Sequence, residues 1–179
     1  MAHSNISIFV PHIGCPCKCS FCNQFSITKQ HYLPNAADVD KAVFDALKSK
    51  RYNAKETEIA FFGGSFTAID REYMTELLSA AKKHIDNGNV SGIRISTRPD
   101  CINKAYLDIL EKWRKKYHKT IHIELGLQTI NYNTLKVSPA RVTKDSYQTL
   151  IQTLEQAKRA LFQKYQDVLV GYKANHRMS

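Results

Sequence analysis

Hydrophobic and polar positions along the chain follow the period of a strand in some segments and that of a helix in others. Short apolar runs predict strands at residues 6–10, 58–62, 93–97 and 120–127, and the run at 168–170 is consistent with the start of a fifth. Apolar residues three and four positions apart predict helices at residues 38–48, 71–86, 104–117 and 143–163. Because strands and helices alternate, we expect right-handed crossovers and a parallel sheet, either open or curved into a barrel.

The apolar stripes of the first two helices are well defined. In the first helix the stripe contains Val39, Val43, Phe44 and Leu47, and in the second it contains Met74, Leu77, Leu78 and Ala81. The second helix is expected to stop near Asn87-Gly88, since these residues are common at helix ends. The helices are therefore expected to pack one face against the sheet.

Segments rich in cysteine, glycine or polar residues follow the first three predicted strands, and another closes the fourth. They are Cys15-Pro-Cys-Lys-Cys19-Ser-Phe-Cys22, Phe62-Gly-Gly-Ser65-Phe-Thr67, Thr97-Arg-Pro-Asp100 and Glu124-Leu-Gly-Leu-Gln128. The carboxyl ends of parallel strands meet at one rim of the sheet, and catalytic groups of parallel β/α folds lie just beyond them. We therefore expect the four segments to converge.

The first of these segments holds four cysteines, and its chemistry points to a metal. Cys15, Cys19 and Cys22 have Cys-x3-Cys-x2-Cys spacing, and thiolates select iron-sulfur clusters, zinc or copper(I). With Cys17 they could also close a four-thiolate zinc site or a saturated cluster. Structural zinc ligands normally form two pairs separated by a dozen or more residues, whereas all four cysteines here crowd into one loop. Cys17 lies too near its neighbours for easy four-point ligation, which favours three ligands with Cys17 outside the set.

Composition indicates one globular domain over residues 1–179, because 43% of the residues are hydrophobic and 23% are charged. The start of the chain has no basic segment followed by an apolar one, and no apolar run approaches the ~20 residues of a membrane span. We expect no membrane contact and a cytoplasmic location with reduced thiols. The lone Cys101 is expected to be a small buried hydrophobe.

The net charge of +10 suggests a polyanionic partner such as RNA. Basic residues gather near residues 48–51, 112–119 and 158–159, which lie on or beside predicted helices. Charge on such helices is commonly a solvated face, so both interpretations stay open.

The cysteine loop after the first strand resembles that of the radical S-adenosylmethionine (SAM) superfamily. The resemblance implies that Cys15, Cys19 and Cys22 hold a [4Fe-4S] cluster, and that its open iron chelates SAM. It further implies reductive cleavage of SAM to a 5'-deoxyadenosyl radical, with an electron donor such as flavodoxin or ferredoxin. The cofactors would carry the chemistry, and the protein would bind and orient them.

The same resemblance implies a set of SAM contacts, namely Phe21, Gly63, Gly64, Arg98, Glu124 and Gln128. Several of them also have a structural interpretation: Gly63 and Gly64 can end a strand with positive φ, and Arg98 can form a salt bridge to Asp100 or Glu124. An unpaired buried carboxylate in the apolar strand at 120–127 would be costly. If Glu124 faces the rim it could accept hydrogen bonds from ribose hydroxyl groups, and Gln128 could bind the same sugar or the SAM carboxylate; alternatively, either residue could satisfy the backbone of a loop.

The ordered motifs are most similar to the bacterial branch related to the Elongator catalytic subunit, over about residues 5 to 138. That resemblance implies modification of wobble uridines in tRNA. An alternative within the superfamily is a relative of oxygen-independent coproporphyrinogen III oxidase. A non-enzymatic alternative is a basic RNA-binding protein with a structural zinc or a closed cluster.

Residues 164–179 are too few for a fifth and a sixth strand with their helices, since a β/α unit with its return strand needs ~30 residues. We therefore expect an α/β fold: a half-barrel of four to five parallel strands with outer helices, incomplete at its carboxyl-terminal end. An open sheet edge would make an oligomer or a partner chain plausible.

Overall fold

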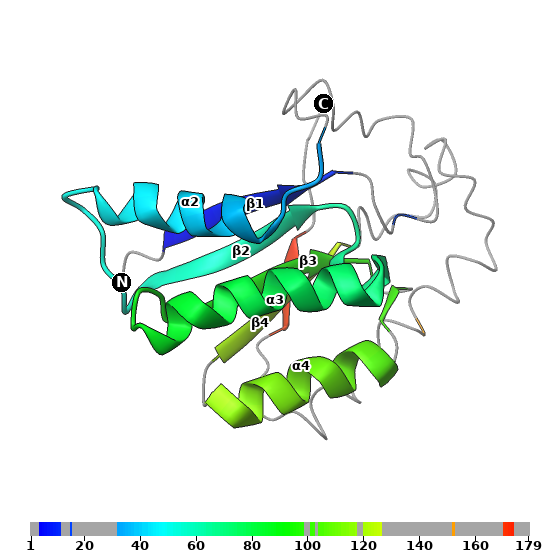
Figure 1. Cartoon of the computed structure of the whole chain (residues 1–179). Coiled ribbons are helices and arrows are strands. Elements are labelled where there is room, and N and C mark those ends of the chain that lie inside the picture. The colour runs from blue at the N-terminus through cyan, green and yellow to red at the C-terminus, as the bar shows by residue number, and fades with distance from the viewer. Residues whose placement is uncertain are drawn as a thin grey trace, which may run out of the picture.

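The chain folds around one parallel sheet. The computed structural model describes residues 4–11, 15, 32–98, 101–102, 104–117, 120–126, 152 and 170–173. Its strands are β1 (Ser4–Val10), β2 (Thr57–Gly63), β3 (Gly92–Thr97), β4 (Thr120–Gly126) and β5 (Val170–Lys173) (Figure 1). They lie in the order β1-β2-β3-β4-β5, and every neighbouring pair is parallel. The predicted partial β/α barrel, with four to five parallel strands, is confirmed.

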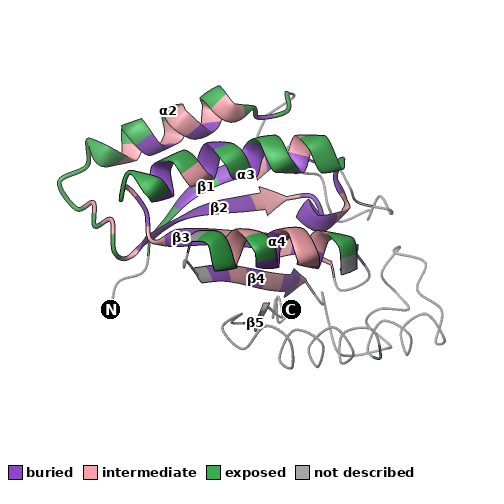
Figure 2. Ribbon diagram, turned by 60° about the horizontal axis from the view of Figure 1, so that its bottom comes forward, coloured by how far each residue is buried: buried purple, intermediate pink, exposed green. Residues whose placement is uncertain are grey.

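Three helices cover the same face of this sheet. They are α2 (Ala36–Leu47), α3 (Arg71–Asp86) and α4 (Lys104–Tyr117), and all three lie on one side of the strands in Figures 1 and 2. A 3-10 turn, η1 (Phe66–Ala68), follows β2. The predicted bounds of α3 and α4 are confirmed, whereas α2 begins two residues earlier and ends one residue earlier than predicted. The helix predicted at 143–163 lies outside the described residues, apart from Gln152.

The core lies between the sheet and these helices. Alternate strand residues point toward it, and the buried ones include Ile8, Ile59, Phe61, Ile93, Ile95, Ile121 and Ile123. They form one apolar cluster with Met74, Leu77 and Leu78 of α3 and with Leu107 and Leu110 of α4. Because strand side chains alternate, residues 58, 94, 122 and 124 project from the opposite face. We call that opposite face the inner face.

Local capping explains where the helices begin. The Asn35 side chain accepts hydrogen bonds from the N–H groups of Ala37 and Asp38, and the Asp38 carboxylate accepts one from the Asn35 N–H. The Asp70 carboxylate caps α3 by accepting hydrogen bonds from the N–H groups of Glu72 and Tyr73. Such caps satisfy donors that have no partner within the helix. Both helices therefore begin where the sequence provides a capping side chain.

The apolar stripe of α2 is only half covered. Val39 and Val43 are fully buried, whereas Phe44 is 51% exposed and Leu47 is 38% exposed. The Phe44 ring meets the His84 ring edge-on at 5.6 Å. Helical spacing correctly placed these residues on a helix. The larger contacts of α2 are with α3 and β1, so its outer side stays in solvent.

None of the helices in the described part of the chain has the length and apolar character of a membrane span.

Candidate functional site

The carboxyl end of β2 lies tightly against the carboxyl end of β1. Gly63 has a φ of +111°, and the Gly64 N–H donates to the Val10 carbonyl at 2.7 Å. A Cβ on Gly63 would lie 2.4 Å from the Val10 oxygen, a distance that real Cβ atoms do not adopt. Only glycine tolerates both this φ and this approach. The positive φ predicted for the glycine pair is present at Gly63, and it holds the second polar segment beside the point where the cysteine segment begins.

The first cysteine of that segment lies at this rim. The Cys15 sulfur is 3.7 Å from the Ser65 hydroxyl oxygen, although fifty residues separate the two in the chain. Ser65 is 1% exposed, and Cys15 is half-buried with its thiol not in a disulfide. The structure therefore brings the segments after β1 and β2 together, as expected. Cys17, Cys19, Phe21, Cys22 and Gln128 lie outside the described residues.

The segment after β3 joins the same rim through two threonines. The Thr67 and Thr97 hydroxyl oxygens are 2.7 Å apart, and the Thr67 hydroxyl also donates to the Cys101 carbonyl at 2.7 Å. Cys101 is buried, as predicted. Arg98 follows Thr97 directly, and its carbonyl accepts from the Cys101 N–H at 3.1 Å. Thr67 thus ties the loop after β2 to the loop after β3, a contact that sequence reasoning did not identify.

Glu124 projects from the inner face of β4, between the buried Ile123 and Leu125. Its carboxylate accepts a hydrogen bond from Arg94 at 2.9 Å and one from the Ser96 hydroxyl at 3.1 Å. The side chain is 14% exposed. Among the described residues it forms an ion pair with Arg94 of the neighbouring strand, so it does not carry the cost of an unpaired buried carboxylate.

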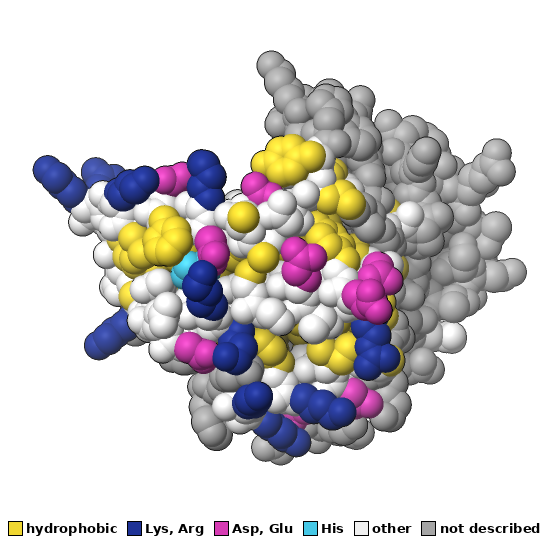
Figure 3. Space-filling view, viewed as in Figure 1, with side chains coloured by type: hydrophobic (Ala, Val, Ile, Leu, Met, Phe, Trp, Pro, Cys, Tyr) yellow, Lys and Arg dark blue, Asp and Glu magenta, His cyan; other side chains and the backbone are white. Residues whose placement is uncertain are grey.

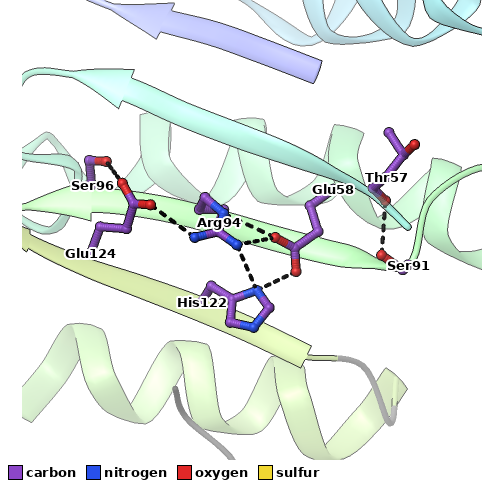
Figure 4. Close-up of polar contacts among 7 residues, drawn as sticks. All are labelled: Thr57, Glu58, Ser91, Arg94, Ser96, His122 and Glu124. Carbon is purple, nitrogen blue, oxygen red and sulfur yellow. Dashed lines mark hydrogen bonds and ion pairs between the residues drawn. The ribbon is translucent and has the colours of Figure 1, made fainter. Parts of the chain in front are cut away.

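A polar cluster that sequence reasoning missed surrounds Arg94 (Figure 4). The Arg94 Nε and Nη2 donate to one oxygen of Glu58 at 3.1 and 3.0 Å, and the other Glu58 oxygen contacts His122 Nδ1. Glu58 is 3% exposed, while Arg94 and His122 are each 18% exposed. We call Glu58, Arg94, Ser96, His122 and Glu124 the inner-face cluster. The signal was present: polar residues at alternate positions of three strands share one face.

Metal-binding potential depends on residues that are only partly described. In the described part of the chain, no three His, Cys, Asp or Glu side chains form a metal-ligand group. Cys15 supplies one thiol at the rim, and the other predicted ligands lie beyond the described residues.

The fold and this rim place the chain in a known class of proteins. The family model of the radical SAM superfamily matches residues 9–176, and the chain belongs to that superfamily. The parallel sheet of alternating strands and helices agrees with this assignment. Proteins of this superfamily typically use a [4Fe-4S] cluster and SAM.

Relatives among curated proteins align with about two thirds or more of the chain. Uncharacterized protein MJ0486 of Methanocaldococcus jannaschii is 28% identical over 130 residues, which cover 73% of this chain and 36% of that protein. Protein YhcC of Escherichia coli K12 is 29% identical over 119 residues, which cover 65% of this chain and 36% of that protein. The chain thus spans about a third of the length of either relative.

Two features of the described rim suit these cofactors. The Cys15 thiol is of the ligand type that iron-sulfur clusters select. Beside it, Gly63 packs against the Val10 carbonyl and the Phe9 ring, which places the glycine pair next to the segment that contains Cys15. The residues present at the rim therefore fit the group that the family implies.

Proposed function

We propose that Cys15, Cys19 and Cys22 hold a [4Fe-4S] cluster and that the chain binds SAM beside it. When bound, the cluster would supply one electron for the reductive cleavage of SAM. In this proposal Cys17 is not a ligand. The contact between the Cys15 thiol and the Ser65 hydroxyl carries the proposal, because it joins the cysteine segment to the glycine pair at one rim.

The chain's own residues would bind and orient SAM. As the family resemblance implies, backbone carbonyl groups at Gly63 and Gly64 would face the methionine amine of SAM. Arg98 would pair with a carboxylate, since a guanidinium suits such a partner. Glu124 would accept ribose hydroxyl groups. Phe21 would pack near the adenine, and Gln128 would bind the ribose or the carboxylate of SAM.

The decisive experiment is electron paramagnetic resonance of the anaerobically reconstituted, reduced protein with and without SAM. We expect a cubane signal that changes when SAM is added, because an open iron is accessible to it. A signal indifferent to SAM would show a closed cluster and contradict the proposal. Absence of any cluster, with zinc retained instead, would favour the structural alternative.

Cysteine variants provide matched controls within one loop. We expect Cys15→Ala, Cys19→Ala and Cys22→Ala each to abolish cluster assembly, and Cys17→Ala to retain it. Iron and sulfide content report the result directly. Loss of the cluster in Cys17→Ala would refute the three-ligand arrangement.

We further infer that the substrate is tRNA, with a wobble uridine as the modified base. The motif resemblance and the net charge of +10 support this, and Lys and Arg side chains gather over α4 in Figure 3. Part of that charge is neutralised locally: hydrogen bonds from Arg114, and then from Lys115, hold the pKa of Glu111 below its usual value. A cytoplasmic location, with flavodoxin or ferredoxin as electron donor, completes the proposal.

Electrophoretic mobility shifts with tRNA, repeated at several salt concentrations, test this part. A phosphate-binding surface predicts affinity that falls steeply as salt rises. A tRNA affinity that does not change with salt concentration, or binding of a tetrapyrrole instead of tRNA, would contradict the tRNA assignment.

A further inference from the structure

The inner-face cluster is costly for the fold. Parallel strands are usually apolar on both faces, yet three neighbouring strands here place charged side chains on one face. Removing two carboxylates and a guanidinium from water carries a desolvation penalty that ion pairing often only balances. Apolar side chains of similar size would serve stability at least as well. A role in binding explains the cluster better than stability does.

Strand register sets how Arg94 lies within it. Gly92 is the register partner of Glu58 on β2, and Ser96 is the register partner of Glu124 on β4. Arg94 lies midway between Gly92 and Ser96 on β3. Its guanidinium therefore reaches diagonally from the Glu58 carboxylate on β2 to the Glu124 carboxylate on β4. Figure 4 shows its side chain between Glu58 and Glu124.

The division of donors within the guanidinium is specific to arginine. Nε and Nη2 contact Glu58, which leaves Nη1 to contact Glu124 at 2.9 Å. A lysine ammonium is a compact point charge and lacks this planar fork. His122 contacts the second oxygen of Glu58, so Glu58 is itself held from a third strand. Glu58 and His122 therefore fix Arg94, and Arg94 fixes Glu124.

The upper end of the cluster adjoins the rim. Ser96 holds the other oxygen of Glu124 at 3.1 Å, and the next residue, Thr97, contacts Thr67 in the loop that follows Ser65. Glu124 is 14% exposed and lies two residues before β4 ends. Its carboxylate is therefore held by Arg94 and Ser96 and lies near the rim.

We propose that Arg94 is a positioning residue for ligand recognition: it holds the Glu124 carboxylate in one orientation, in which it accepts hydrogen bonds from the vicinal hydroxyl groups of a ribose. This inference rests on the proposed binding of SAM, and it adds the residues that set the geometry of that contact. Arg94, Glu58 and His122 act through Glu124 and do not touch the ligand.

The test compares SAM affinities of the anaerobically reconstituted protein and its variants by isothermal titration calorimetry. Arg94→Lys keeps the charge but cannot span both carboxylates, so we expect about tenfold weaker binding. Arg114→Lys is the matched control, because Arg114 is 19% exposed against 18% for Arg94 and pairs with Glu111 at the same 2.9 Å. The control is expected to bind SAM within about twofold of the wild type.

A second ligand separates positioning from a general structural effect. S-adenosylhomocysteine and its 2',3'-dideoxy analogue differ only in the hydroxyl groups assigned to Glu124. If Arg94 acts through that contact, Arg94→Lys weakens the hydroxylated ligand and leaves the dideoxy analogue nearly unchanged, which is the coupling that a double-mutant cycle measures. Equal weakening of both ligands would overturn the positioning role.

Ser96→Ala is a gentler variant in case Arg94→Lys fails to fold. It removes one hydrogen bond to Glu124, and we expect about threefold weaker binding of the hydroxylated ligand alone. Unchanged affinity in both variants, with SAM binding intact in the wild type, would overturn this inference and leave the proposed function standing. A wild type that assembles its cluster but binds no SAM would overturn both.

Discussion

Gly63→Ala tests the close approach on which the rim depends. The new methyl group would lie 2.4 Å from the Val10 carbonyl oxygen and 3.1 Å from a ring carbon of Phe9. Backbone cannot swing aside as a flexible side chain can, so β1 or β2 must shift. The residue that would shift, Val10, ends the strand that leads into the cysteine segment. A stability defect and a defect in cluster assembly are therefore expected together.

The magnitude follows from two contributions. Holding alanine at a φ of +111° costs about 1–3 kcal/mol. Forcing a methyl group into filled space costs about another 1–3 kcal/mol. The expected loss of about 2–6 kcal/mol is a large part of the ~5–15 kcal/mol that stabilises a typical domain.

Gly88→Ala is the matched control. Gly88 also has a positive φ, +72°, but a Cβ there would meet nothing within 4 Å. Its expected cost is about 1–2 kcal/mol from backbone conformation alone. Alanine also reduces the entropy of the unfolded chain, but it does so at both sites, so this effect cancels in the comparison.

Urea unfolding followed by circular dichroism gives the two free energies of unfolding, and iron content gives cluster assembly. We expect Gly63→Ala to be the less stable variant by about 1–3 kcal/mol and to hold less iron. If Gly63→Ala is no less stable than Gly88→Ala, the packing of Gly63 on Val10 is refuted.

Two further predictions concern polar contacts. Thr67→Val removes both hydrogen bonds of a fully buried hydroxyl and is expected to lower the free energy of unfolding by about 1–3 kcal/mol in urea titrations. Thr75→Val, at an exposed site, is the control and is expected to change the free energy of unfolding little. Equal effects of the two substitutions would contradict the bridging role of Thr67. Hydrogen bonds from Lys83, and then from His84, lower the pKa of Asp40 below 3.8. This stabilisation is present above pH 3.8 and is lost as pH falls through the lower folded-state pKa, so Asp40→Asn is expected to flatten that part of a stability-against-pH curve. An unchanged curve would refute the coupling.

The helices and strands could be predicted because their signals are local. In α3, Met74, Leu77 and Leu78 recur at helical spacing, and the capping residue Asp70 directly precedes the helix. The strand boundaries differ from prediction by one or two residues in β1 to β4, since apolar alternation fades gradually at strand ends.

The candidate site could be predicted only in outline. The rim position of Cys15, Gly63 and Glu124 follows from strand order, because each lies at or near the carboxyl end of a parallel strand. The partner of Glu124 did not follow. Alternation in Ile-Arg-Ile-Ser-Thr places Arg94 and Ser96 on one face of their strand, but it does not identify the residues of neighbouring strands that they meet.

The sequence by itself determined the order of elements and the kinds of residue at the rim, because periodicity, caps and motif spacing act over a few neighbouring positions. Only the tertiary structure decided which distant groups meet. Arg94 is 36 residues from Glu58 and 30 from Glu124, and strand register alone brings them within hydrogen-bonding distance. Likewise, helical spacing predicted Phe44 on the same apolar stripe as Val43. Because α2 packs against one neighbouring helix, the Phe44 side chain is exposed.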